Sequence, residues 1–89
     1  MSPSEIKKYA EKHGVTFEVE GGAASGGWNV DCWAPSGQIW KATGIHFLAL
    51  PGDGYYTRPD WSETMAALKG YIEAGFEPCA DAECDVCHP

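Results

Sequence analysis

The chain is short of basic residues. Six lysines and arginines stand against thirteen aspartates and glutamates, which leaves a formal net charge of −7 at pH 7. A protein that binds nucleic acid through its phosphates needs a basic patch. The clustered bases Lys7, Lys8 and Lys12 are typical of a solvated helix face instead. We therefore expect no nucleic-acid partner, and an acidic DNA mimic ranks last because the acids are scattered or gathered near the C-terminus.

Long apolar runs are also lacking. No run approaches the ~18 apolar residues that a membrane span requires. The first residues, MSPSEIKKYAEKHG, contain no apolar core of a signal peptide. We therefore expect a cytoplasmic protein without membrane contact, in which cysteines are kept reduced.

Catalytic constellations are lacking as well. The three histidines stand in no catalytic spacing, and no pair of carboxylates suggests acid–base chemistry. His46 lies among Ile45, Phe47 and Leu48, a setting typical of a satisfied core histidine. We expect no enzyme.

The capping residues and the apolar pattern that are present predict two helices. Ser2 begins a capping-box pattern for a helix over Pro3 to His13, and Gly14 ends it. A second helix starts near Asp60, which has a glutamate three residues on, and Gly75 ends it. Its apolar stripe consists of Trp61, Met65, Leu68 and Ile72.

Between the helices the pattern predicts strands. Apolar and polar residues alternate over Val15–Glu20, and a glycine-rich connection follows. The turn Ala34-Pro35-Ser36-Gly37 predicts a β-hairpin between Trp28 and Trp40. The nearly all-apolar run Ile45–Leu50 predicts a buried strand. The expected fold is a two-layer α+β domain of helix, three- or four-stranded antiparallel sheet and helix over residues 1–76, with an acidic, irregular Cys-rich tail over residues 77–89.

The hairpin register places tryptophan on both faces of this sheet. Trp28 and Cys32 point to one face, while Asp31, Trp33 and Trp40 point to the other. A small antiparallel sheet usually buries only one face. If the helices cover the first face, Trp33 and Trp40 become exposed anchors for a protein partner beside Asp31. The alternative is that the tail or the loop over residues 51–59 covers them.

The tail carries the second lead. Cys79, Cys84, Cys87 and His88 lie within ten residues, and Cys84-x-x-Cys87 is the spacing with which two thiolates share a zinc ion. His88 is an awkward fourth ligand because it directly follows Cys87. The folded domain would then supply His13, His46 or Cys32.

Other interpretations of these cysteines remain open. They fit plain thiols or a disulfide formed on oxidation. Cys84-x-x-Cys87-His88 also matches the haem-attachment pattern, which we set aside because only Pro89 follows and no export signal exists. We expect no cofactor unless the tail binds zinc.

The phrase running from Trp28-Asn-Val to Ala34-Pro-Ser-Gly-Gln-Ile-Trp40-Lys-Ala-Thr-Gly-Ile-His46, with the Cys-rich end, resembles small orphan accessory proteins of actinobacterial phages. The resemblance implies an accessory product in the host cytoplasm that acts by binding a host protein. It assigns no functional residue. The first hypothesis is thus a non-enzymatic protein-binding module, as monomer or homodimer. The alternative is a zinc-stapled module whose tail organises a site, in one variant of the hypothesis a site for nucleic acid.

Overall fold

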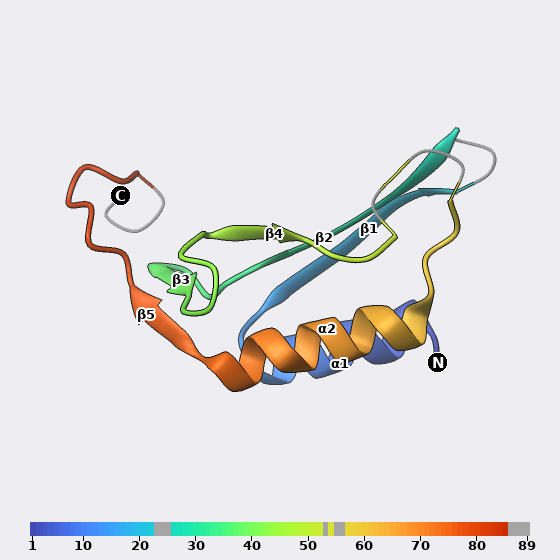
Figure 1. Ribbon diagram of the computed structural model, residues 1–89, viewed down its shortest axis with the longest axis horizontal. Helices are drawn as coiled ribbons and strands as arrows, with labels where there is room; N and C mark the ends of the chain where they lie inside the picture. Colours follow the sequence, from blue (N-terminus) through green and yellow to red (C-terminus); the bar gives the residue numbers. More distant parts are fainter. Residues whose placement is uncertain (23–25, 53, 55–56, 86–89) are drawn as a thin grey trace.

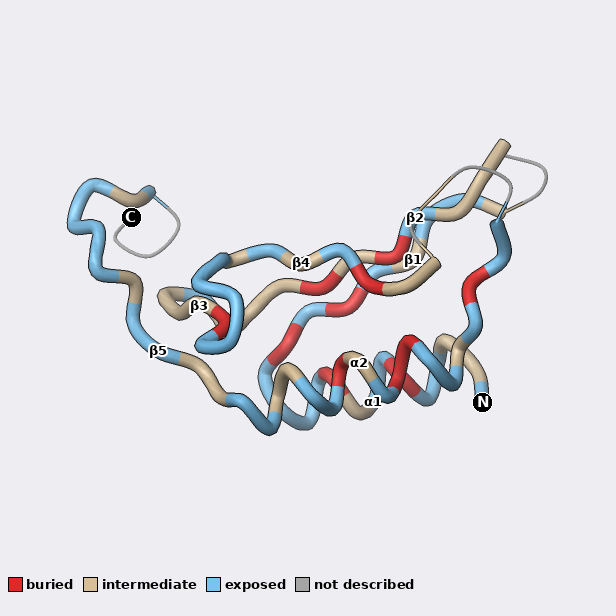
Figure 2. Tube along the Cα trace, in the orientation of Figure 1, coloured by how far each residue is buried: buried red, intermediate tan, exposed pale blue. Residues whose placement is uncertain are grey.

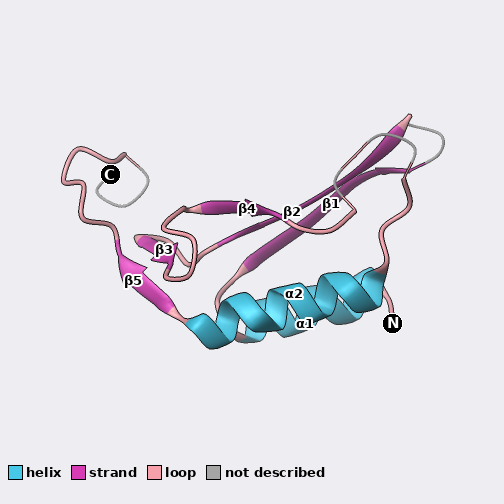
Figure 3. Cartoon of the chain, in the orientation of Figure 1, coloured by secondary structure: helices cyan, strands magenta, loops and turns pink. Residues whose placement is uncertain are grey.

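The structure is a computed structural model that describes residues 1–22, 26–52, 54 and 57–85. Within these ranges the chain forms two helices and five strands (Figures 1 and 3). The helices are packed against each other in one layer, and the longer strands form a second layer over them. The expected α+β class is confirmed. In order along the chain, the elements are α1 (Pro3–Lys12), β1 (Thr16–Gly22), β2 (Gly27–Trp33), β3 (Gln38–Trp40), β4 (Phe47–Ala49), α2 (Trp61–Ala74) and β5 (Phe76–Pro78).

Both helices begin after their predicted capping residues; α2 ends before Gly75 as expected, and α1 ends at Lys12, one residue before the predicted His13. The Ser2 hydroxyl accepts a hydrogen bond from the Glu5 backbone N–H at 3.4 Å, and the Asp60 carboxylate accepts one from the Glu63 N–H at 3.2 Å. Gly75 ends α2 with a φ of 90°, a conformation that favours glycine. Neither helix of the described chain has the length and apolar character needed to cross a membrane.

The main sheet has the strand order β1-β2-β4 and is antiparallel throughout. Because side chains alternate along each strand, one face presents apolar residues to the helices. Figure 2 shows the buried segments gathered where strands and helices face each other. The core consists of Ile6, Ala10, Val15, Phe17, Val30, Cys32, Trp40, Leu50, Met65 and Leu68.

The expected hairpin between β2 and β3 is wrong. The turn itself forms, since the Gln38 N–H donates to the Pro35 carbonyl at 3.0 Å. The edge of β2 that β3 would need is taken by β4, and the Ala34 N–H continues that pairing with a bond to the His46 carbonyl at 3.1 Å. Strand β3 therefore turns away from the main sheet.

Strand β3 instead pairs with β5 in a separate two-stranded sheet. Glu77 and Pro78 belong to β5, so the irregular tail begins at Cys79 rather than at residue 77. The pairing places Trp40 opposite Phe76, and the Trp40 ring packs against the rings of Phe76 and Tyr71, with centroids 5.0 and 5.7 Å away.

The expected exposure of Trp40 is therefore also wrong. Its side chain is fully buried, and its indole Nε1 has no hydrogen-bond partner among the described residues. The run Ile45–Leu50 is likewise less buried than its apolar composition predicts. Leu50 is in the core, but Ile45 is 43% exposed and Phe47 is 40% exposed. These two alternate with inward-facing residues, and an all-apolar run conceals that alternation.

Candidate metal centre

His46 lies directly before β4, where its backbone is held from two sides. Its carbonyl accepts the bond from Ala34 described above, which ties it to the end of β2. The carbonyl of the preceding residue, Ile45, accepts a hydrogen bond from the Trp40 N–H at 2.9 Å. The imidazole is thus attached to a well-anchored segment between the two sheets, and its side chain is partly exposed.

Two cysteines reach the same place from the other end of the chain. Cys79 directly follows β5, so the pairing of β5 with β3 positions it. Cys84 comes after a turn in which Asp81 accepts two hydrogen bonds, from the Cys84 N–H to its carbonyl at 3.1 Å and from the Glu83 N–H to its carboxylate at 3.0 Å. Both cysteine side chains are partly exposed.

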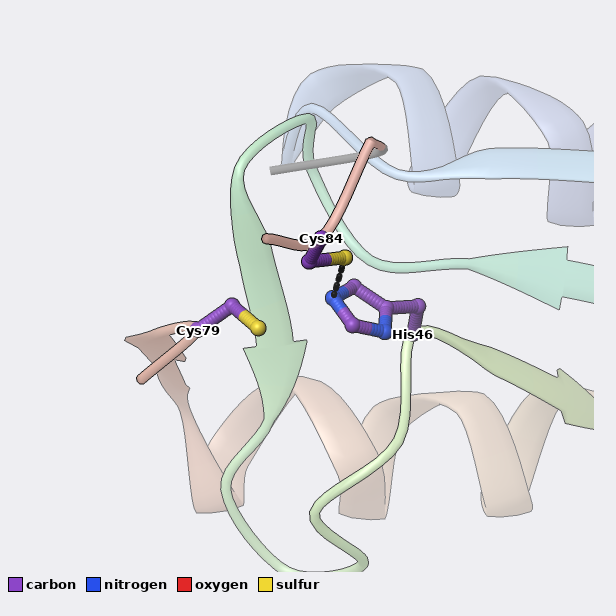
Figure 4. A group of neighbouring side chains, drawn as sticks. All are labelled: His46, Cys79 and Cys84. Carbon is purple, nitrogen blue, oxygen red and sulfur yellow. Dashed lines mark hydrogen bonds between the residues drawn. The ribbon is translucent and has the colours of Figure 1, made fainter. Parts of the chain in front are cut away.

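We call His46, Cys79 and Cys84 the metal group. Their ligand atoms all lie within 4.8 Å of one another, and the Cys84 Sγ is 3.8 Å from the His46 Nε2. Figure 4 shows the two sulfur atoms and the imidazole edge turned toward one shared space. The three side chains are close enough to hold a metal ion.

The geometry can be compared with that of a tetrahedral zinc site. Bonds of ~2.3 Å to sulfur and ~2.0 Å to nitrogen at a tetrahedral angle set the two ligand atoms about 3.5 Å apart. The distance of 3.8 Å between Cys84 and His46 is close to that value. Thiolate and imidazole are also ligands that zinc prefers, whereas calcium and magnesium prefer oxygen ligands.

The structure unites some of the metal ligands that the sequence suggests and separates others. Cys79 and Cys84 are together, and of the three residues considered as a ligand from the folded domain, His46 joins them. Cys32 is in the core, and His13 is exposed at the end of α1 against Tyr9. Two further expected ligands, Cys87 and His88, lie outside the described residues.

The residues next to His46 in the sequence do not predict that it joins the metal group. Its apolar flanks predict a core position, and the sequence contains no local signal that links it to a cysteine more than thirty residues away. The link depends on the pairing of β3 with β5, which carries Cys79 to the start of β4.

The other candidate site is the face of the main sheet that points away from the helices, which we call the outer face. In the described part of the chain no helix covers it (Figure 1). Trp33 and Asp31 lie on it as expected and are half-buried, and Trp40 does not. By strand alternation and register it consists of Thr16, Glu18, Glu20, Asn29, Asp31, Trp33, Phe47 and Ala49.

On the outer face Phe47 takes the place that Trp40 was expected to fill. The register sets Phe47 opposite Trp33, and their ring centroids are 5.1 Å apart with an angle of 55° between the planes. Beside them, the Asn29 side-chain amide donates to the Asp31 carboxylate at 2.9 Å. The face thus combines an aromatic pair with acidic groups.

Comparisons of the chain with protein-family models, with curated proteins and with solved structures found no match. The resemblance to phage accessory proteins therefore stays a prediction, and function has to be inferred from the chemistry of these residues.

Proposed function

We propose that this protein is a zinc-stapled module that binds one zinc ion through His46, Cys79, Cys84 and Cys87. The observation that carries the proposal is the convergence of the first three ligand atoms within 4.8 Å. Cys87 is chosen as the fourth ligand because Cys84-x-x-Cys87 is the spacing with which two cysteines share one tetrahedral ion. His88 is less suitable, because it is adjacent to Cys87.

The chemistry of the set favours a structural rather than a catalytic zinc ion. Three thiolates and one imidazole fill the four tetrahedral positions and leave none open for water or substrate. This supports a non-enzymatic role. Zinc would join the residue before β4 to the segment after β5, which lies more than thirty residues further along the chain. A domain of 89 residues buries only ~60–65% of its unfolded surface, so such a link adds needed stability.

The test is native mass spectrometry of protein purified without chelator, with cobalt(II) titration as a second readout. We expect the mass of the chain plus one zinc ion, and a thiolate-to-cobalt absorption band. Cys84→Ser and His46→Gln each remove a ligand, so each should weaken zinc binding by more than the ~10–100-fold that the loss of an outer-shell partner of a ligand costs. A bare mass together with no cobalt band would refute the proposal.

Matched variants make the result specific. His13→Gln changes an exposed histidine outside the metal group and should keep the zinc ion. Comparing Cys87→Ser with His88→Gln identifies the fourth ligand, and we expect only the cysteine variant to lose affinity. Equal zinc retention in His46→Gln and His13→Gln would show that His46 is not a ligand.

A second candidate function, protein binding through the outer face, is favoured by the Trp33–Phe47 pair. Phe47 is 40% exposed and its ring packs at a tilt against the half-buried Trp33, without a covering helix in the described chain. Aromatic side chains in such positions are frequent anchors of protein interfaces. A host protein bound in the cytoplasm would agree with the resemblance to phage accessory proteins.

This second function predicts a loss of binding without a loss of folding. Trp33→Ala should abolish the retention of a partner from host-cell extract, since one such anchor contributes ~2 kcal/mol or more. Its thermal midpoint should stay close to that of the parent. Tyr9→Ala, which changes a half-buried ring on α1, is the control. Unfolding of Trp33→Ala would instead make Trp33 a structural residue.

A further inference from the structure

The edge strand β1 has one side that pairs with nothing in the described chain. The order β1-β2-β4 leaves β1 paired with β2 alone. On β2, the Val30 carbonyl accepts a hydrogen bond from the Leu50 N–H at 3.1 Å, so the backbone groups of Val30 point toward β4. Val19 is directly opposite Val30, and the two form a pair without mutual hydrogen bonds. The N–H and C=O groups of Val19, and by alternation those of Phe17, therefore point outward from the sheet.

A groove follows this open edge. One hollow of about 390 Å³ is lined by Pro3 and Lys7 of α1 and by residues 17–20 of β1. A second of about 160 Å³ continues it, between Lys7 and Glu11 of α1 and residues 15–18. Consecutive residues of a strand point to opposite faces, so a hollow lined by four in a row runs along the strand edge. The groove has the form that an added strand would fill.

The charges beside the edge define the occupant. Glu18 and Glu20 stand on the outer face of β1, and Asp31 stands next to Glu18 on β2. The outer face has no lysine or arginine among its described residues. An added strand would set its outward side chains beside these acids, where lysine or arginine is favourable.

The same charges disfavour a second copy of this chain. Pairing Val19 with Phe17 or Val19 of another copy would set Glu18 opposite Glu18 or Glu20. Like charges directly opposite each other in a sheet are destabilising. The net charge of −7 adds to the repulsion between copies.

We propose that the open edge of β1 binds an extended basic segment of another protein by strand addition. The backbone groups of Phe17 and Val19 pair with the segment, and its alternate basic side chains lie beside Glu18 and Glu20. Its other side chains enter the groove beside α1, where Lys7 and Glu11 offer both charges. This inference depends neither on zinc nor on Trp33, so its test is separate from theirs.

The test uses the full chain and a synthetic peptide of roughly ten residues in which lysine and threonine alternate, with blocked ends. In the protein alone, the Phe17 and Val19 amides should exchange with solvent rapidly, while the Glu18 amide, paired with β2, exchanges slowly. The peptide should slow exchange at Phe17 and Val19. A peptide of alternating glutamate and threonine should have no effect.

Two variants examine the two parts of the recognition. Val19→Pro removes the outward N–H, which an edge strand tolerates, and should abolish binding, whereas Val19→Ala keeps it. Glu18→Lys with Glu20→Lys should weaken binding about tenfold. The matched control is the double variant Glu73→Lys with Glu77→Lys. It changes the net charge by the same amount, at exposed positions outside the groove.

Three results would overturn the proposal. One is the absence of any protection of the Phe17 and Val19 amides by the lysine peptide. Another is equal weakening by the two charge-reversed variants, since binding would then follow net charge alone. The third is protection of these amides that rises with protein concentration in the absence of peptide, which would assign the edge to a second copy.

Discussion

Cys32 shows how strongly burial controls the chemistry of a single residue. Its side chain is fully buried on β2, facing the helices. Burial, with a smaller contribution from the charge of Asp31, raises the pKa of the Cys32 thiol from its ordinary value of 9.0 to about 12. Of the cysteines that the structure describes, this one is a core residue rather than a ligand, and it stays protonated where an exposed thiol would ionise.

This shift predicts a loss of stability in alkaline solution. Above pH 9 the unfolded chain releases the Cys32 proton while the folded chain keeps it until about pH 12. The stabilisation is therefore complete below pH 9 and decreases as the pH rises toward 12. The free energy of unfolding should fall by about 1 kcal/mol per pH unit from this group, measured by urea unfolding over this range.

Cys32→Ala is the control for the alkaline effect. It leaves a small cavity and lowers the stability at neutral pH, but it removes the titrating group. The difference in unfolding free energy between parent and variant should shrink as the pH rises. Parallel curves for the two proteins would show that Cys32 does not titrate differently in the folded and unfolded states.

At the same scale, Trp40 and Phe47 mark the limit of what the sequence could predict. Alternation assigns a residue to a face only when the strand belongs to the sheet in question. Trp40 belongs to a different sheet, so the face predicted for it on the main sheet does not apply. Its ring is packed between α2 and β5. Phe47 was concealed by an apolar run, although its position opposite Trp33 leaves it 40% exposed.

At the scale of elements, local signals were sufficient for the helices and insufficient for the strand pairing. Ser2, Asp60 and Gly75 act through hydrogen bonds and dihedral angles within their own turns, so the sequence contains the whole cause. The Ala34–Gly37 turn forms as predicted, yet a turn does not decide which strand will occupy the next edge. The free edge of β2 is occupied by β4 instead, which pairs with β2 at Asp31, Cys32 and Trp33.

The candidate metal centre depends on this same pairing. Because β4 displaces β3, strand β3 becomes available to β5, and β5 carries Cys79 to His46, directly before β4. The Cys-x-x-Cys spacing in the tail predicts a metal site. Which residue of the folded domain joins it depends on tertiary pairing, so the sequence alone left His13, His46 and Cys32 as alternatives.

At the scale of the whole molecule, the structure consists of a larger part and a smaller part that share one core, and the proposed zinc ion would secure the smaller part. The larger part contains α1, β1, β2 and most of α2, whose apolar residues face one another directly. The smaller part contains β3 and β5, which are three residues long and hold Trp40 as the main buried side chain. Short two-stranded sheets are marginal without further support.

Removal of zinc should therefore loosen one part of the molecule more than the other. With zinc at a thousand times its dissociation constant, the loss of binding would cost about 4 kcal/mol of stability, and the thermal midpoint should fall on addition of chelator. The Trp40 and Lys41 amides, which donate to the carbonyls of Ile45 and Gly75 at 2.9 and 3.0 Å, should lose protection from hydrogen exchange. The amides of Leu68 and Leu50 should lose less, because both residues belong to the core, which does not include the metal group, and the Leu50 N–H donates to the Val30 carbonyl at 3.1 Å. Equal loss at all four amides would instead mean that zinc holds the fold as one cooperative unit, and unchanged protection would mean that β3 and β5 are stable by packing alone.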